Sequence, residues 1–342
     1  MSLRIIYGKA GSGKTRFCFE EIKKKINLEN KIYIITPEQF SYSAEKELLN
    51  ILDENSVLNA EVISFNRIAH RIFNEVGGAN KVHITKAGKA MLIDWILQEH
   101  AKNLNYLNRS NDNIEVVMNT ITEMKKHEVT KEKLAEVIEK TQDINLKLKL
   151  NDIFILYKDY ENFIHNKYID EEEILTKLAD MIKQSTMFDN AIIYIDEFFG
   201  FTKQEYNILS ELLKKAKQVN ITVCTDELEI RNIPEIDIFY SNKEFSRKIL
   251  DLANLANVEV ENEIHLENLY RFKNEDLKHL EENIYNISYQ KYFKEPKNIK
   301  LFLAANPYSE IEYVAKEISK LVRSGMKYSD ISIITKDISR YR

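Results

Sequence analysis

The chain has 342 residues and a formal net charge of −5 at pH 7, with 49 Lys and Arg against 54 Asp and Glu. This balance argues against a protein that coats nucleic acid with its whole surface, although a local basic groove remains open. Two cysteines without a CxxC pattern exclude a cysteine-based zinc or cluster site in this chain and fit a reducing compartment. No apolar run reaches the roughly 20 residues that a membrane span needs. We therefore expect a cytoplasmic protein of about two domains.

Short apolar runs alternate with amphipathic stretches in the N-terminal quarter of the chain. The runs at 3–7, 31–35 and 60–64 have the length of strands, and helical spacing at 15–26 and 43–52 separates them. Strands that alternate with helices are typical of a parallel sheet. This part of the sequence predicts an α/β domain.

The pattern changes at Thr85. From there to Gln184, apolar residues recur at three- and four-residue spacing, and no convincing strand interrupts them. The strand pattern returns at 191–195 and 219–225. We therefore expect a large helical insertion within one α/β domain. The insertion spans residues 85–184, and the α/β domain is formed by residues 1–84 and 185–298.

The last part of the chain predicts a new strand–helix–strand unit. Its strands are expected at 299–304 and 331–335, with a helix at 309–323 between them. One such unit cannot enclose a core of its own. Residues 299–342 therefore indicate the truncated start of a second α/β domain and a chain that is a fragment of a longer polypeptide. The alternative is that these strands join the first sheet.

A glycine-rich motif follows the first predicted strand and fits G-x-x-x-x-G-K-[ST] at every position; its residues are Gly8, Lys9, Ala10, Gly11, Ser12, Gly13, Lys14 and Thr15. Glycines allow the backbone to approach a ligand closely, with consecutive N–H groups directed at phosphate oxygens. Lys14 would neutralise the β- and γ-phosphates, and the Thr15 hydroxyl would ligate Mg²⁺. Because a strand precedes the motif and a helix follows it, the sequence predicts a nucleoside triphosphate site. A fortuitous glycine loop is the alternative.

A pair of carboxylates, Asp196 and Glu197, follows the apolar run at 191–195. Ligands of open α/β sheets bind at the carboxyl ends of the strands. We expect Asp196 to hold Mg²⁺ through water and Glu197 to polarise the hydrolytic water as the catalytic base. The alternative is an acidic turn after a strand. Asp226 follows the next strand and could equally sense the γ-phosphate or belong to a turn.

The order of these parts resembles the superfamily 1 helicases of the UvrD/Rep type. More narrowly, it is similar to the N-terminal part of AddB (RexB in some lineages), the second subunit of the bacterial AddAB helicase–nuclease. The resemblance spans nearly the whole chain. It rests on Gly8 to Thr15, Ile35 to Phe40 with Ala44-Glu45, Val62 to Arg67, Ile195 to Thr202 with Glu205, Glu310 with Val314-Ala315 and Ile318, and Tyr328 to Thr335.

This resemblance implies a subunit that unwinds and resects DNA double-strand ends for recombination repair. It implies ATP and Mg²⁺ as cofactors, an AddA-like helicase subunit as the partner in a heterodimer, DNA ends as substrate, and no membrane. The sheet domain would be motor domain 1A with a RecA-like P-loop NTPase fold. The insertion would correspond to domain 1B, and 299–342 to the start of domain 2A. The iron–sulfur cluster of the family's nuclease domain is expected only in the C-terminal region that this chain lacks. DNA contacts are expected from Pro37, Gln39, Phe40, Phe65 and Arg67.

Two departures from the helicase pattern limit the expected activity. The first strand begins at Leu3, which leaves no room for the glutamine-bearing segment that recognises adenine in these helicases. The segment that begins at Cys224 lacks the Gly-Asp…Gln-Ser-Ile-Tyr pattern that couples ATP to DNA. We therefore expect the fragment to bind ATP–Mg²⁺ but to hydrolyse it slowly or not at all. A small-molecule P-loop kinase with a helical lid and a nucleotide-gated assembly module are the alternatives.

Overall fold

The computed structural model describes residues 1–27, 29–52, 59–77, 82–107, 111–228, 233–286 and 288–341. The chain forms two compact units, Met1–Arg271 and Phe272–Arg342, each of which is described by itself. The division precedes the domain boundary that we expected at residue 298. Across the described ranges, no helix combines the length and the apolar character needed to cross a bilayer.

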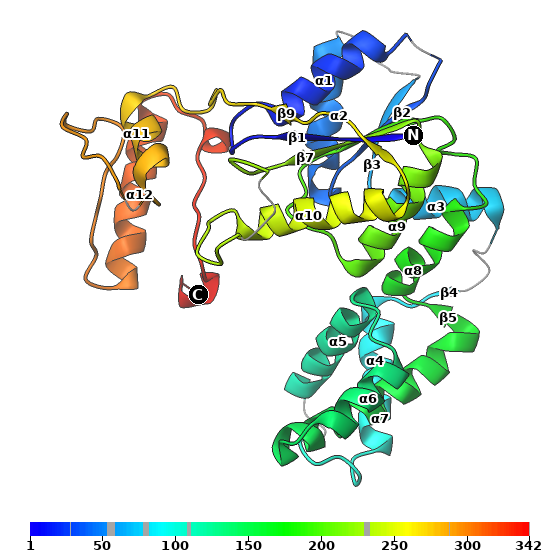
Figure 1. Ribbon diagram of the computed structural model, residues 1–342. Coiled ribbons are helices and arrows are strands. Elements are labelled where there is room, and N and C mark those ends of the chain that lie inside the picture. Colours follow the sequence, from blue (N-terminus) through cyan, green and yellow to red (C-terminus); the bar gives the residue numbers. More distant parts are fainter. Residues whose placement is uncertain are drawn as a thin grey trace. The chain divides into compact units, whose positions relative to one another are not determined.

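A parallel sheet forms the centre of the first unit (Figure 1). Its strands are β1 (Ser2–Tyr7), β2 (Ile32–Ile35), β3 (Ala60–Ile63), β6 (Ile192–Ile195), β7 (Gln218–Val223), β8 (Glu259–Val260) and β9 (Ile264–His265). The order is β3-β2-β6-β7-β1-β8, and β9 also pairs with β1. Every residue of β2 and β6 is buried, as expected for parallel strands with helices on both faces. The prediction of an α/β fold with a parallel sheet is confirmed.

Two hydrophobic clusters cover the two faces of this sheet. On one face lie α1 (Lys14–Lys25) and α2 (Glu38–Leu52). On the other lie α3 (Phe65–Val76), α8 (Glu171–Ile182), α9 (Lys203–Lys215) and α10 (Tyr240–Leu255). Alternate residues of one strand enter different clusters, as the two-residue period of a strand requires: Tyr194 packs with α1 and α2, whereas Ile193 and Ile195 pack with the opposite helices.

The strand order brings the predicted motifs to one edge of the sheet. Strand β7 lies between β1 and β6, with Tyr7 opposite Val223 and Ile195 opposite Ile221. The residues that follow these strands therefore leave the sheet at its carboxyl edge. Gly8, Asp196 and Cys224 begin the three loops that meet there.

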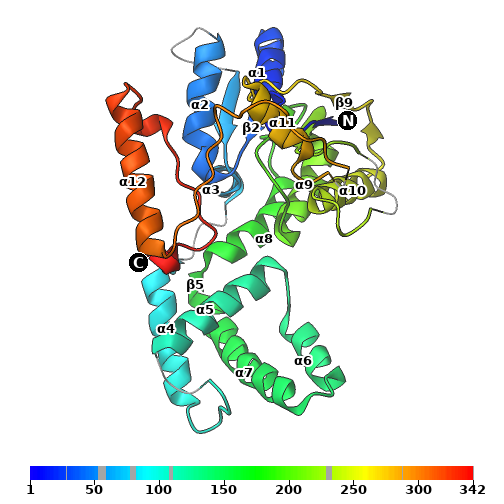
Figure 2. The same cartoon turned by 90° about the vertical axis from the view of Figure 1, so that its left-hand side faces the viewer.

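The predicted insertion is helical, but short strands lie at its ends. Strand β4 (Val82–His83) pairs in parallel with β5 (Tyr168–Ile169). Between them, α4 (Lys86–Glu99), α5 (Asn111–Lys126), α6 (Lys131–Lys140) and α7 (Ile144–Lys167) share a third hydrophobic cluster and are grouped together in Figure 2. Helix α8 falls within the predicted insertion, yet its apolar residues pack in the cluster of the sheet. Within the predicted insertion, α8 therefore differs from the four described helices before it, because its hydrophobic contacts are with the sheet.

Among its described residues, the second unit has the helices α11 (Glu275–Asn283) and α12 (Pro307–Arg323) and the short 3₁₀ turns η1 (Tyr328–Asp330) and η2 (Ile338–Tyr341). The strands that we predicted at 299–304 and 331–335 do not form, so that prediction is wrong. A strand needs a paired neighbour to be stable. The apolar side chains of these segments are instead exposed, Leu301 to 99% and Ile334 to 94%.

Candidate functional site

The glycine motif forms the turn between β1 and α1. Gly11 and Gly13 have φ values of +85° and +84°, a conformation that L-residues with side chains rarely adopt. A Cβ atom on Gly11 would lie 2.5 Å from Cβ of Arg271, and one on Gly8 would lie 2.5 Å from the carbonyl oxygen of Leu266. The loop can therefore close only with glycine at these positions.

Among the described residues, the side chains of Lys14 and Ser12 in this loop have no partner that would compete with an anion. Lys14 Nζ donates to the carbonyl oxygens of Gly8 at 2.8 Å and Lys9 at 3.0 Å. In the described ranges, Lys14 forms no ion pair, and the buried Ser12 Oγ has no hydrogen-bond partner. Burial lowers the pKa of Lys14 from its ordinary value of 10.5, and the carboxylate of Asp196 opposes that shift. A half-buried cation held only by carbonyl groups, next to glycines, fits a phosphate.

The two predicted carboxylates lie beside the loop. Asp196 is 4% exposed and accepts a hydrogen bond from the Thr222 hydroxyl of β7. Glu197 Oε1 accepts a hydrogen bond from Thr15 Oγ1 at 3.1 Å. Its backbone has a φ of 65°, which is unusual for glutamate and is often found at functional sites. The structure thus places Thr15 next to Glu197, and it places Asp196 against β7.

These oxygen atoms fit a magnesium ion that arrives with a nucleotide. Mg²⁺ prefers oxygen ligands and usually takes one or two protein carboxylates, with phosphate and water as its other ligands. Thr15, Asp196 and Glu197 supply such oxygens. Within the described part of the chain, no three His, Cys, Asp or Glu side chains gather closely enough to hold a metal by themselves. Any ion here would therefore depend on the phosphates.

A cavity of about 530 Å³ joins the loop and the carboxylates. Its lining includes the five motif residues Ala10, Gly11, Gly13, Lys14 and Thr15, together with Arg16, Glu47, Asp196, Glu197, Phe198, Phe199, Thr222, Cys224, Tyr270 and Arg271. All of them belong to the first unit. The cavity therefore unites the residues that the sequence singled out on separate strands.

Tyr270 and Arg271 are lining residues that the sequence did not reveal. Strand β9 runs parallel to β1 and leads the chain across the glycine loop. There Tyr270 N donates to the Gly11 carbonyl oxygen at 2.9 Å. A Cβ atom on Gly13 would lie 3.3 Å from the Tyr270 ring. The Tyr270 ring and the Arg271 cation thus reach the cavity from the segment that follows β9. This strand has two residues and is too short to recognise by alternation.

The residues expected to contact DNA begin two helices at the same edge of the sheet. Pro37, Gln39 and Phe40 lie at the start of α2, and Phe65 and Arg67 at the start of α3. Gln39 and Arg67 are exposed, and Pro37 and Phe40 partly so. The Phe65 ring is only 6% exposed, because it packs against two rings of the loop that follows Glu197, those of Phe198 and Phe201. Phe65 supports that loop and has little surface to offer a nucleic acid.

Asp226 does not line the cavity. Its carboxylate pairs with Lys243 of α10 at 3.1 Å and accepts a hydrogen bond from its neighbour's backbone, Glu227 N, at 2.9 Å. Of the two roles considered from the sequence, these contacts favour the turn residue.

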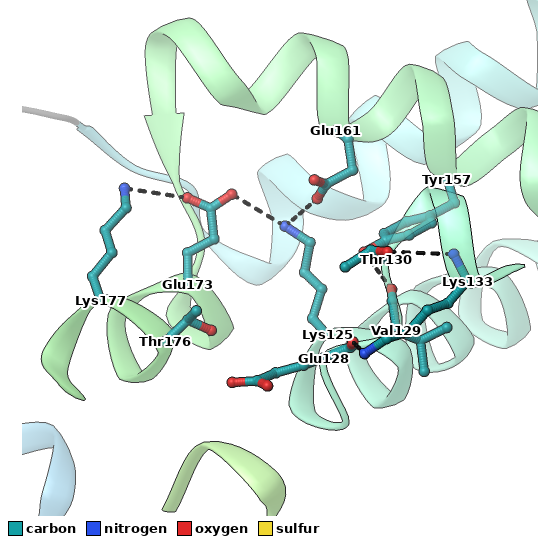
Figure 3. Close-up of a pocket in the computed structure, with 10 residues that line it drawn as sticks. All are labelled: Lys125, Glu128, Val129, Thr130, Lys133, Tyr157, Glu161, Glu173, Thr176 and Lys177. Atoms are coloured by element: carbon teal, nitrogen blue, oxygen red, sulfur yellow. Dashed lines mark hydrogen bonds and ion pairs between the residues drawn. The ribbon is translucent and has the colours of Figure 1, made fainter. Parts of the chain in front are cut away.

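A second cavity, of about 510 Å³, lies in the helical insertion (Figure 3). Lys125 is buried there and pairs with Glu161 at 2.6 Å, Asp170 at 2.7 Å and Glu173 at 3.3 Å. Burial opposes the charge of this lysine, but Asp170 and Glu161 outweigh burial and raise its pKa well above the ordinary value. Figure 3 also shows Lys177 directed at Glu173. The lysines and carboxylates in this cavity largely neutralise one another.

Comparisons with known proteins agree with the resemblance. A family model described as "ADDB, N-terminal" matches residues 5–281. Over its full length, the chain is 44% identical to a protein of Clostridium tetani and 39% identical to one of Clostridium botulinum (strain Loch Maree / Type A3). It is 38% identical to one of Caldanaerobacter subterraneus subsp. tengcongensis. All three are named as a subunit of an ATP-dependent helicase/deoxyribonuclease, and the chain spans 31%, 31% and 30% of their respective lengths. The chain belongs to the AddB family and matches its N-terminal region.

Proposed function

We propose that this chain is the helicase-like, ATP-binding N-terminal region of a helicase/nuclease subunit that resects DNA double-strand ends in recombination repair. In this proposal, residues 1–84 and 185–298 form a RecA-like P-loop NTPase domain of the 1A type. Residues 85–184 are its 1B-like insertion, and 299–342 begin domain 2A. One observation carries the proposal: Lys14, Thr15, Asp196 and Glu197 line a single cavity at the carboxyl edge of a parallel sheet.

The roles of the residues follow from this cavity. Backbone N–H groups of the glycine loop and the N-terminus of α1 bind phosphate oxygens, and Lys14 neutralises their charge. Arg271 adds a second cation beside Gly11 of the loop. Thr15 and Asp196 hold Mg²⁺, which neutralises the phosphates. Glu197 is the catalytic base.

Slow hydrolysis is part of the proposal. Glu197 Oε1 accepts a hydrogen bond from the Thr15 hydroxyl, so one of its two oxygens is engaged by the glycine loop in this structure. The described residues that line the cavity all belong to the first unit. We therefore assign the fragment nucleotide binding with little or no autonomous ATPase activity.

The proposal includes DNA ends as substrate and an AddA-like helicase subunit as partner. The relatives are named as one subunit of a helicase/deoxyribonuclease, which supports a heterodimer of this kind. Gln39 and Arg67 are the exposed candidates for DNA contacts, with Pro37 and Phe40 beside Gln39. Contacts to phosphates would make DNA binding fall steeply as salt is raised.

A titration with a fluorescent ATP analogue and Mg²⁺ tests the nucleotide site. We expect the wild-type chain to bind the analogue and Lys14→Ala to bind it at least roughly 30-fold more weakly, because charge-assisted contacts to phosphate are lost. Lys177→Ala, which removes an exposed lysine of the insertion, is the matched control and should bind normally. Unchanged affinity of Lys14→Ala would refute the site.

Phosphate release, measured with and without single-stranded DNA, tests the second part of the proposal. We expect release near the background rate in both conditions. Turnover of the fragment that DNA stimulates would contradict the slow ATPase and would indicate an autonomous motor.

A further inference from the structure

The first turns of α10 hold the chain where it leaves β7. Asn242 Nδ2 donates to the carbonyl oxygen of Cys224 at 2.6 Å. The next residue, Lys243, is only 2% exposed, and its Nζ contacts three carboxylates. These are Asp226 at 3.1 Å, Glu227 at 3.0 Å and Asp237 at 2.7 Å. A lysine buried this deeply rarely occurs without such partners.

Two of these carboxylates, those of Asp226 and Glu227, follow the proposed nucleotide site closely in the chain. Cys224 lines the cavity together with Lys14, and Asp226 follows two residues later. Glu227 also acts electrostatically on the strand that leads into the glycine loop. Burial raises the pKa of Tyr7, the last residue of β1, and the negative charge of Glu227 raises it further. Asp226 is thus two residues from a lining residue and Glu227 three, and charges interact over roughly 10 Å at moderate salt, so a triphosphate in the cavity would be exposed to their field.

Negative charge at this place would oppose nucleotide binding. The side chains of Asp226 and Glu227 are 41% and 58% exposed, so neither is confined by burial. Burial opposes the charge of Lys243, but its hydrogen bonds to Asp237, Glu227 and Asp226 outweigh burial and raise its pKa. The ammonium group thus remains charged and attracts both side chains toward α10.

We propose that Lys243 is a positioning residue of the nucleotide site, which holds the carboxylates of Asp226 and Glu227 against α10 and so reduces their repulsion of the triphosphate. This inference rests on the proposed function, since it concerns the affinity of the same cavity. It assigns α10 an electrostatic role in addition to its packing against the sheet.

The test measures the affinity for ATP–Mg²⁺ of Lys243→Met over a range of salt concentrations. We expect roughly fivefold weaker binding at low salt and a difference that shrinks as salt is raised, because screening weakens the repulsion. Lys177→Met is the matched control. It removes the same charge from a lysine–carboxylate pair in the insertion, and its affinity should equal that of the wild type.

Rescue separates this electrostatic role from a merely structural one. Adding Asp226→Asn and Glu227→Gln to Lys243→Met should restore most of the lost affinity, because the neutral amides no longer repel phosphate. A loss that is independent of salt, or that the two amides do not rescue, would overturn the inference.

A third variant covers the case in which Lys243→Met fails to fold. Asp226→Asn with Glu227→Gln keeps hydrogen-bond acceptors for Lys243 and should bind ATP–Mg²⁺ as tightly as the wild type or more tightly. Weaker binding would overturn the inference. If the wild type itself does not bind, the proposed function fails. If the wild type binds and Lys243→Met behaves like Lys177→Met, only the role of Lys243 fails.

Discussion

The two cavities have nearly the same volume, about 530 Å³ at the glycine loop and about 510 Å³ in the insertion, but their charges are arranged differently. In the insertion, the buried Lys125 contacts three carboxylates. At the glycine loop, neither Lys14 nor Arg271 forms an ion pair with any residue that the structure describes. Size therefore does not distinguish the proposed binding site from the insertion cavity, whereas the pairing of the cations does.

This difference has a physical basis. Desolvating an ion costs several kcal/mol unless a partner of opposite charge compensates for it. In the insertion, the protein supplies that partner and links α5 to α7 and α8. At the glycine loop, carbonyl groups compensate only in part, and an anionic ligand can complete the neutralisation. Stability should therefore depend on the insertion cavity and nucleotide affinity on the cavity at the glycine loop.

The largest expected effect concerns Lys125. Lys125→Met leaves three carboxylates in or near a buried site and should lower the free energy of unfolding by about 3–5 kcal/mol. Chemical denaturation measures this change. Lys177→Met removes only an exposed partner of Glu173 and should cost under about 1 kcal/mol. If both substitutions have the same effect, the insertion cavity is not a structural junction.

Substitution of Arg271 should have the opposite effect to that of Lys125, because it should change nucleotide affinity and not stability. Arg271→Gln should weaken ATP–Mg²⁺ binding roughly tenfold, since one charge-assisted contact is lost, and should leave the free energy of unfolding unchanged because no ion pair with a described residue is broken. Nucleotide titration and thermal unfolding of the same sample measure both quantities. If Arg271→Gln lowered the free energy of unfolding but left the affinity for ATP–Mg²⁺ unchanged, Arg271 would have a structural role and the proposed difference between the two cavities would be wrong.

A smaller effect is expected from the backbone of the loop. Gly13→Ala places a side chain at a φ of +84°, next to the Tyr270 ring, and should lower stability by about 1 kcal/mol. Gly200→Ala is the matched control, because a Cβ atom there would have no neighbour within 4 Å and its φ is not positive. Equal stability of the two variants would show that the loop does not require glycine at position 13.

The smallest expected effect on stability near neutral pH comes from the titration of Asp170. Burial raises the pKa of this carboxyl, but Lys125 outweighs burial and holds the pKa below its ordinary value of 3.8. The resulting stability is therefore present above the unfolded pKa and is lost as the pH falls through the folded pKa. Unfolding measured from pH 7 to pH 3 should show a loss below roughly pH 5, and Asp170→Asn should reduce that loss. Asp180→Asn, in an exposed pair with Lys183, should not.

Local sequence predicted the centre of the sheet because buried parallel strands are continuous apolar runs. The runs at 3–7, 31–35 and 191–195 correspond closely to β1, β2 and β6. The glycine motif and the carboxylate pair could be placed on one edge for the same reason, since residues that follow parallel strands meet there.

Other parts depend on contacts between distant segments, which local periodicity does not encode. Strands β8 and β9 are two residues each and exist because they pair with β1, more than 250 residues away. The position of Arg271 follows from that pairing. Conversely, the run at 299–304 has the composition of a strand but no partner strand among the described residues. Helix α8 resembles its neighbours in the insertion, and only its tertiary contacts place it with the sheet.

The parallel pairing of β4 and β5 gives the insertion a simple description. The four described helices between these strands, α4 to α7, together form one crossover connection. A dozen or so residues suffice for such a connection. The sheet pairs β2 with β3 and β6 without using any residue of α4 to α7. A shortened chain with one helix in their place could therefore preserve the strand order, and the additional length of the natural insertion is surface that the sheet itself does not require.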